Sequence, residues 1–110
     1  MFKKLIPVTI KRHKDKKGGH PHVIMGDIED KHVSVGLTSK PTKGKNQPNY
    51  ALEKDPLNTG RKSYMRRQGT VAPKEEYDRP RKGDMAPKDY DRATEYGEKA
   101  KQKYLTNKKR

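Results

Sequence analysis

The stretch HVIMGDIEDKHVSVGL, residues 22–37, decides the fold. Its two outer runs, residues 22–25 and 32–37, are rich in β-branched side chains, and the segment between them contains a glycine and three acids. Apolar runs on either side of a short polar, glycine-containing segment are typical of a β-hairpin. The register of this hairpin pairs His32 near Asp27. We therefore expect a chain that is built around antiparallel strands.

The segment before the hairpin predicts one more strand. Residues 5–11 form a β-branched run that fits an edge strand, because Pro7 lacks the backbone N–H that a central strand needs. A basic loop is expected over residues 12–19.

The segment after the hairpin predicts two further strands. The second of them continues after a kink, because glycine in a strand favours a local distortion. The expected segments are a polar loop at 39–49, a strand at 49–53, a turn at 55–61, a strand at 63–68, a kink at Gly69 and an extension at 70–72.

A helix is predicted from Pro87 onward. Proline suits the first helical turn, and Asp89 and Asp91 lie where the helix dipole favours acids. Small and aromatic residues then recur at three- and four-residue steps and mark one narrow face. They are Tyr90, Ala93, Gly97, Ala100 and Tyr104. This face fits closely against a sheet but buries little area.

The expected fold is mainly β: a small, curled antiparallel barrel with a C-terminal helix and basic, flexible termini. Residues 1–18 would be a basic N-terminal strand or arm and loop, residues 19–105 a single barrel domain with its terminal helix, and residues 106–110 a disordered basic tail. The predicted core is thin, so dimerisation or a bound partner would help to stabilise it. It consists of Leu5, Ile6, Val8, Ile10, Val23, Ile24, Met25, Val33, Val35, Leu37, Leu52, Met65 and Val71.

Composition excludes several classes of protein. The 110 residues include no cysteine, which rules out a disulfide framework, a thiol nucleophile and cysteine-ligated zinc. No apolar stretch approaches the roughly 20 residues that cross a bilayer, and no secretory signal is recognisable. We expect a cytoplasmic protein without a membrane partner.

Charge favours a polyanionic partner. Lys and Arg number 28 against 14 Asp and Glu, a formal net charge of +14, and an excess of this size most often reflects nucleic acid. The alternative is a solvated surface that only keeps the chain soluble. The residues predicted to bind nucleic acid are Lys16, Lys17, Ser39, Lys40, Lys43, Arg61, Lys62, Tyr64 and Arg67.

Four short motifs follow one another in a distinctive order. They are GHPHVIM at residues 19–25, VSVGLTSK at 33–40, RQGTV at 67–71 and KGDMAPKD at 82–89. This succession resembles the MazF/PemK family of toxin endoribonucleases over about residues 17–105. The resemblance implies an SH3-like barrel, usually a homodimer, whose concave basic face binds single-stranded RNA. It also implies RNA cleavage without a metal ion, and inhibition by an acidic protein partner such as an antitoxin.

The chain departs from the family pattern at three positions. His20 stands where the family has an arginine before proline, Arg67 replaces an acid and Thr70 replaces an arginine, whereas Thr38 is retained. These changes leave two readings open. The chain is either a ribonuclease with altered chemistry or a non-catalytic module, encoded for example by a phage or mobile element, that binds nucleic acid or an acidic protein.

Three residues are predicted to be catalytic. Metal-free RNA cleavage needs a base for the 2′-OH proton, an acid for the leaving 5′-oxygen and cations near the phosphorus. His20 is predicted as base or acid, Arg66 as a phosphate ligand and Thr38 as a hydrogen-bond donor to a nonbridging oxygen. The alternative is an ordinary loop histidine and a threonine that only ends a strand. Arg66 and Arg67 face opposite sides of an extended strand, so at most one of them would enter a given groove.

The HPH triplet at residues 20–22 raises the question of a metal site. Both histidine rings would lie on one side of a strand, but no third ligand is evident, so neither a metal nor another cofactor is predicted. Tyr50, Tyr64 and Tyr77 can stack on bases. The alternative is that Tyr64 fills the core and the other two tyrosines cover its edge.

Overall fold

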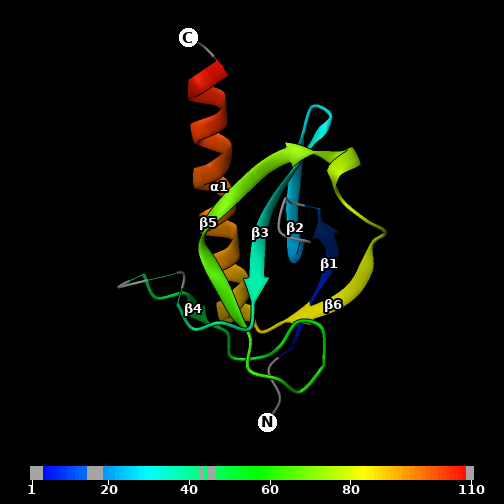
Figure 1. Cartoon of the computed structure of the whole chain (residues 1–110), viewed down its shortest axis with the longest axis vertical. Helices are drawn as coiled ribbons and strands as arrows, with labels where there is room; N and C mark the ends of the chain where they lie inside the picture. Colours follow the sequence, from blue (N-terminus) through cyan, green and yellow to red (C-terminus); the bar gives the residue numbers. More distant parts are fainter. Residues whose placement is uncertain (1–3, 15–18, 43, 45–46, 109–110) are drawn as a thin grey trace.

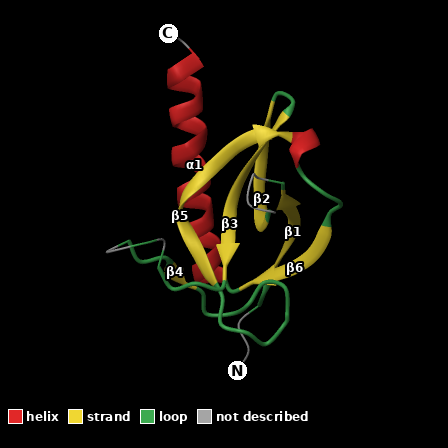
Figure 2. Ribbon diagram, in the orientation of Figure 1, coloured by secondary structure: helices red, strands yellow, loops and turns green. Residues whose placement is uncertain are grey.

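The computed structural model describes residues 4–14, 19–42, 44 and 47–108 of the chain (Figures 1 and 2). These residues form six strands, one short 3₁₀ helix and one long α-helix. In chain order they are β1 (Ile6–His13), β2 (His20–Ile28), β3 (Lys31–Thr38), β4 (Tyr50–Ala51), β5 (Tyr64–Pro73), η1 (Lys74–Glu76), β6 (Arg81–Met85) and α1 (Pro87–Lys108).

The predicted hairpin is confirmed and forms the centre of one antiparallel sheet. The sheet order is β4-β5-β3-β2-β1-β6, and Asp27 pairs with His32 as expected. Met25 is an extra residue in β2, because Ile24 pairs with Ser34 and Gly26 with Val33. The fold is therefore mainly β with one C-terminal helix. The expected closure into a barrel is not found among the described strands, since the sheet ends at β4 on one side and at β6 on the other.

The prediction that the first strand lies at an edge is wrong. β1 lies between β2 and β6, and its pairing with β2 begins only at Thr9. Pro7 pairs only with Asp84 of β6, so this part of β1 has a neighbouring strand on one side alone. The N–H that proline lacks is therefore not needed for hydrogen bonds to a second strand. Arg12 and His13, expected in a loop, extend β1.

Strand β6 was not predicted. Its sequence RKGDM has no β-branched residue, so its strand conformation comes from pairing with β1 and not from local preference. The predicted strand over residues 49–53 shortens to Tyr50–Ala51. Leu5, expected in the core, is 39% exposed.

Helix α1 packs on one face of the sheet, alongside β5 (Figure 2). The predicted stripe of small residues is confirmed: Ala93 and Gly97 are buried, and a Cβ on Gly97 would lie 3.1 Å from the Cβ of Met25. The buried core between α1 and the sheet consists of Ile10, Val23, Val35, Leu37, Met65, Met85, Ala93 and Tyr96, of which Ala93 and Tyr96 belong to α1. Met85 and Tyr96 were not in the predicted core.

The first turn of α1 is fixed to the loop that follows β4. Asp89 is fully buried, and its Oδ2 accepts hydrogen bonds from the backbone N–H groups of Glu53 and Lys54 at 2.8 and 3.4 Å. Burial raises the pKa of this carboxyl, while the two backbone hydrogen bonds lower it. The last turn continues beyond the expected boundary, because residues 106–108 are helical and Lys108 pairs with Glu29.

Candidate nucleic-acid interface

The sheet face opposite α1 carries all four histidines of the chain. His13 pairs with His20 across β1 and β2, so their side chains lie on the same face. His22 follows His20 by two residues and hydrogen-bonds to Ser34, which in turn follows His32 by two residues. Strand alternation thus gathers on one surface four residues that are spread over 20 positions of the sequence.

Part of this face is hollowed into an open cleft of about 1190 Å³. Three histidines and two arginines line it together with polar side chains, and none of its lining residues is an acid. The lining residues are His13, His20, His22, Gly36, Leu37, Gln47, Pro48, Asn49, Arg66, Arg67, Gln68, Gly69 and Thr70. We call this surface the histidine cleft.

A buried hydrogen-bond chain fixes His22 in the wall of the cleft. Its Nδ1 lies 2.9 Å from Ser34 Oγ, and that oxygen lies 2.8 Å from the hydroxyl of Tyr77. Ser34 is completely buried. Burial raises the pKa of the Tyr77 hydroxyl, partly opposed by the Ser34 hydrogen bond, so the tyrosine stays protonated at neutral pH. Because Nδ1 is held in this chain, Nε2 is the nitrogen that His22 presents toward Gly36.

Tyr77 also fixes the positions of the neighbouring rings. Its ring centroid lies 4.8 Å from that of His13, 6.2 Å from that of His22 and 5.0 Å from that of His32. His13 also contacts Glu76, whose Oε1 lies 3.0 Å from His13 Nε2. Tyr77 is 7% exposed, so the buried tyrosine of this group is Tyr77, and not Tyr64 as the alternative to base stacking had it. Tyr50 and Tyr64 are half-buried.

Arg66 stands opposite His22 because β5 is irregular at this point. Val35 pairs with Gly69 and Leu37 with Met65, so three residues of β5 face the single Gly36 of β3. This bulge brings both Arg66 and Arg67 into the lining of the cleft, and the prediction that only one of them enters a groove is wrong. A Cβ on Gly36 would lie 3.2 Å from His22 Nε2 and 3.3 Å from Arg66 Cγ. Glycine therefore lets the two side chains approach each other.

One nitrogen of Arg66 lacks a partner within the described part of the chain. Its Nη1 is buried and makes no hydrogen bond there. Buried guanidinium donors are almost always hydrogen-bonded, and an unsatisfied one costs free energy. Nη1 itself is closed to solvent, but Arg66 lines the cleft, and its positive charge favours an anionic ligand there.

His32 forms a second polar cluster beside the cleft. Its Nδ1 donates to Asp27 Oδ1 at 2.5 Å, which leaves Nε2 to accept a hydrogen bond from Lys11 Nζ at 2.9 Å. Asp27 also lies 3.4 Å from Lys74 Nζ. The hydrogen bond from His32 lowers the pKa of Asp27 below the usual 3.8, partly opposed by burial and assisted by Lys74.

This cluster predicts an acid-sensitive contribution to stability. A carboxyl whose pKa is lowered by folding stabilises the fold fully above its unfolded-state pKa, and this contribution is lost as the pH falls from about 4 through the folded-state pKa. Asp27→Asn is expected to reduce the free energy of unfolding at pH 7 by less than about 1 kcal/mol, because the side chain is half-exposed. Its unfolding free energy should also change less between about pH 5 and pH 2. Urea unfolding at several pH values tests this, with Asp91→Asn on the exposed side of α1 as the control. An unchanged acid dependence in Asp27→Asn would contradict the prediction.

The structure brings together part of the predicted site. His20, half-buried, and Arg66 line the histidine cleft with Arg67, whose Nε donates to the carbonyl of Pro48 at 3.1 Å. Thr38 is not among the lining residues: it ends β3, and its Oγ1 accepts a hydrogen bond from the backbone N–H of Lys40 at 3.2 Å. A catalytic role for Thr38 therefore stays a prediction from the sequence.

The other predicted binding residues lie elsewhere. Arg61 and Lys62 are exposed and line a separate depression with residues 52–55, so the basic cluster from Arg61 to Arg67 is divided between two surfaces. Ser39 and Lys40 are exposed in the turn after β3, and Tyr64 pairs with Thr38. Lys16, Lys17 and Lys43 lie outside the described residues.

Sequence reasoning missed His13, His22, Ser34 and Tyr77 as members of one site. The spacing of two between His20 and His22 predicts that both side chains lie on one strand face, but it does not show that His13, Ser34 and Tyr77 lie beside them. Among the described residues, no group of three or more His, Asp or Glu side chains is placed to hold a metal ion. No helix in this part of the chain has both the length and the apolar character that crossing a bilayer requires.

Comparison with protein-family models, with curated proteins and with solved structures finds no match for this chain. The fold and the histidine cleft are therefore the basis for a functional assignment.

Proposed function

We propose that the chain binds single-stranded RNA in the histidine cleft and cleaves it without a metal ion. The observation that carries this proposal is the approach of Arg66 and His22 to each other in the histidine cleft: both residues line it, and a Cβ on Gly36 would lie 3.2 Å from His22 Nε2 and 3.3 Å from Arg66 Cγ. A phosphate seated there would accept from the arginine while the imidazole exchanges a proton.

The proposed reaction is an internal transesterification. The 2′-oxygen of one nucleotide attacks the adjacent phosphorus, the new O2′–P bond forms and the P–O5′ bond breaks. One histidine takes the proton of the 2′-OH, and a second gives a proton to the leaving 5′-oxygen. The products are a 2′,3′-cyclic phosphate and a free 5′-OH.

The lining of the cleft offers residues for both proton transfers. We assign one to His22, whose Nδ1 is held by Ser34, and the other to His20, which lies two residues away on the same strand face. Arg66 supplies the positive charge that stabilises the phosphorane. The three groups come from β2 and β5, so they meet only once β3 is placed between these strands.

The resemblance to toxin endoribonucleases supports the same function. We propose that the open sheet is a variant of the SH3-like barrel: η1 carries the chain from β5 back to β1, where Asp78 N donates to the carbonyl of Arg12 at 2.9 Å. A homodimer and an acidic protein partner such as an antitoxin belong to this proposal, as does action in the cytoplasm.

The second candidate is a non-catalytic nucleic-acid-binding module with the same fold. The position of Thr38 favours it, because this retained family residue is not part of the cleft lining and its hydroxyl accepts from Lys40. Such a module would bind RNA through Arg66 and Arg67 but leave it intact.

A cleavage assay in EDTA distinguishes the two candidates. The purified chain is incubated at low salt with single-stranded RNA of mixed sequence, and the product ends are analysed. We expect fragments with cyclic phosphate ends, and about 100-fold slower cleavage by Arg66→Ala. Arg61→Ala removes the same charge from the separate depression and should change the rate less than about threefold.

Other outcomes of this assay would support the binding module or contradict both candidates. Tight, salt-dependent binding without fragments supports the binding module, and the salt slope then counts the phosphate contacts. If the RNA is neither bound nor cut, both candidates fail. Equal losses in Arg66→Ala and Arg61→Ala would show that net charge, and not the cleft, governs the activity.

A further inference from the structure

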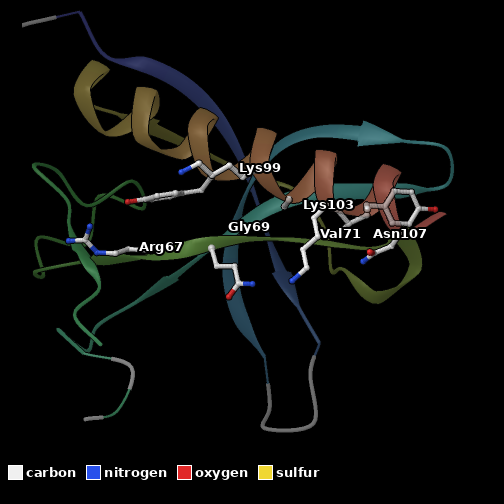
Figure 3. A pocket seen from close by; sticks show the side chains of 10 residues that line it. Arg67, Gly69, Val71, Lys99, Lys103 and Asn107 are labelled. Atoms are coloured by element: carbon white, nitrogen blue, oxygen red, sulfur yellow. The ribbon is translucent and has the colours of Figure 1, made fainter. Parts of the chain in front are cut away.

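A second hollow lies between β5 and the C-terminal half of α1. No histidine lines it, but it shares Arg67, Gln68 and Gly69 with the histidine cleft. Its volume is about 330 Å³. Figure 3 shows it with Arg67, Gly69 and Val71 on the strand and Lys99, Lys103 and Asn107 on the helix. The remaining lining residues are Gln68, Tyr96, Ala100 and Tyr104. We call it the helix groove.

The outer edge of β5 runs along this groove without a strand partner in most of its length. On its inner side β5 pairs with β3 at Tyr64 and Met65 and again from Gly69 to Pro73, with the bulge between, whereas on its outer side β4 pairs only with Tyr64 and Met65. Among the described residues, no strand covers the edge from Arg66 to Pro73. Every second backbone N–H and C=O of such an edge points outward and can pair with another extended chain.

Helix α1 packs closely against β5, so the free edge of β5 lies next to the helix. A Cβ on Gly69 would lie 2.7 Å from the carbonyl oxygen of Tyr96 and 2.8 Å from the Cβ of Ala100. The helix therefore meets β5 at Gly69, and no backbone hydrogen bond between α1 and β5 is formed in the described part of the chain. The apolar part of the lining includes Val71, Ala100 and the two tyrosines, Tyr96 and Tyr104.

The charge of the groove has one sign. Arg67, Lys99 and Lys103 line it, and no lining residue is an acid. The Lys99 side chain is 74% exposed, and its Nζ lies 3.4 Å from Glu95 Oε1. Lys103 forms no ion pair within the described residues. The groove thus attracts an acidic ligand.

We propose that the helix groove binds an extended acidic segment of a partner protein, which adds as a strand to the free edge of β5. Its backbone pairs with β5, its carboxylates meet Arg67, Lys99 and Lys103, and its apolar side chains contact the apolar lining residues. An acidic protein partner is already part of the proposed function; the binding site on β5 and the extended, strand-like conformation of the partner are added here, and they do not depend on RNA binding.

Two other occupants fit the groove less well. A second copy of this chain, paired edge to edge, would bring two sets of the same cations together and repel. RNA would neutralise the cations, but its phosphates would leave the paired pattern of donors and acceptors on the strand edge unused. An acidic strand satisfies both features at once.

Titration of the full chain with a defined peptide tests the proposal. The probe is a seven-residue peptide of alternating glutamate and valine, labelled with fluorescein for anisotropy. A lysine–valine peptide is the charge control. The same glutamate–valine peptide with N-methyl groups on alternate residues is the backbone control, because it cannot donate the ladder hydrogen bonds. We expect saturable binding of the first peptide, no binding of the second and at least about tenfold weaker binding of the third.

Variants of α1 locate the site. Lys103→Glu reverses a charge in the groove, whereas Lys101→Glu makes the same change two residues away, in a depression that it shares with Met25 and Gly97. We expect Lys103→Glu to weaken peptide binding about tenfold and Lys101→Glu to change it less than about threefold. Amide hydrogen exchange should slow within residues 66–72 when the peptide is bound.

Several results would overturn the proposal. These are no binding of the glutamate–valine peptide at millimolar concentration, equal binding of its N-methylated form, or equal effects of Lys103→Glu and Lys101→Glu. Protection of the same β5 amides by an oligoribonucleotide but not by the peptide would assign the groove to nucleic acid. Protection confined to residues 20–22 would place the peptide in the histidine cleft. The ribonuclease assay is independent of all these readouts, so either proposal can fail alone.

Discussion

Replacing His22 by asparagine is expected to slow RNA cleavage about 1000-fold while the chain remains folded and still binds RNA. Asparagine can still hydrogen-bond to Ser34 in the position of Nδ1, but it has no atom in the place of Nε2. General acid–base catalysis by a positioned histidine contributes about 10²- to 10⁴-fold to a rate. Arg66 still holds the phosphate, so RNA affinity should change less than about threefold.

His32→Asn is the matched control for this prediction. His32 lies on the same sheet face and is also buried, but it does not line the histidine cleft. Cleavage rates under single-turnover conditions, RNA affinity and thermal unfolding are measured for both variants. Comparable loss of cleavage in His32→Asn, or normal cleavage by His22→Asn, would contradict the assignment of the proton transfer to His22.

Ser34 is a positioning residue in the proposed reaction, because it acts on the cleft only through its hydrogen bond to His22. Ser34→Ala would leave the imidazole present but remove the link to Tyr77. The expected signature is a shifted pH–rate profile with an unchanged affinity for RNA. A merely structural role would lower stability without moving the profile.

Replacing Gly69 by valine is expected to destabilise the fold by about 3 kcal/mol. The new Cβ would lie 2.7 Å from a backbone oxygen of α1 and 2.8 Å from the Cβ of Ala100. Backbone at this distance cannot yield by a rotamer change, so the helix must move away from β5. Valine itself is favourable in strands, and the loss therefore measures the clash between helix and sheet.

Gly26→Val is the control for this substitution. Gly26 lies in β2, and no atom lies within 4 Å of the Cβ that a side chain would add there. Its free energy of unfolding should change by about 0.5 kcal/mol or less. Urea unfolding of both variants gives the comparison. If Gly69→Val is as stable as Gly26→Val, the close contact between α1 and β5 does not exist in solution.

The central elements of the fold were predictable because they are encoded locally. The alternation of residues 22–37 predicted the hairpin and the pairing of Asp27 with His32, and the stripe of small residues predicted the buried face of α1. Periodicity predicts such elements because it is set by a few neighbouring residues. β6 could not be found in this way, because RKGDM has no strand signal of its own and is a strand only where β1 pairs with it.

For the candidate site, the sequence alone determined the chemistry available: a large excess of positive charge, four histidines and no cysteine. It also singled out His20 and Arg66, which do line one cleft. It did not show that His13 and His22 join them or that Arg61 and Lys62 belong to a different surface.

Only the tertiary structure decided these groupings. The bulge in β5 opposite Gly36 turns two successive arginines toward one cleft, and the crossing of η1 brings Tyr77 onto three histidine rings. Both arrangements depend on the register between strands that are distant in the sequence. That register is set by packing across the whole sheet and not by the residues on either side of each side chain.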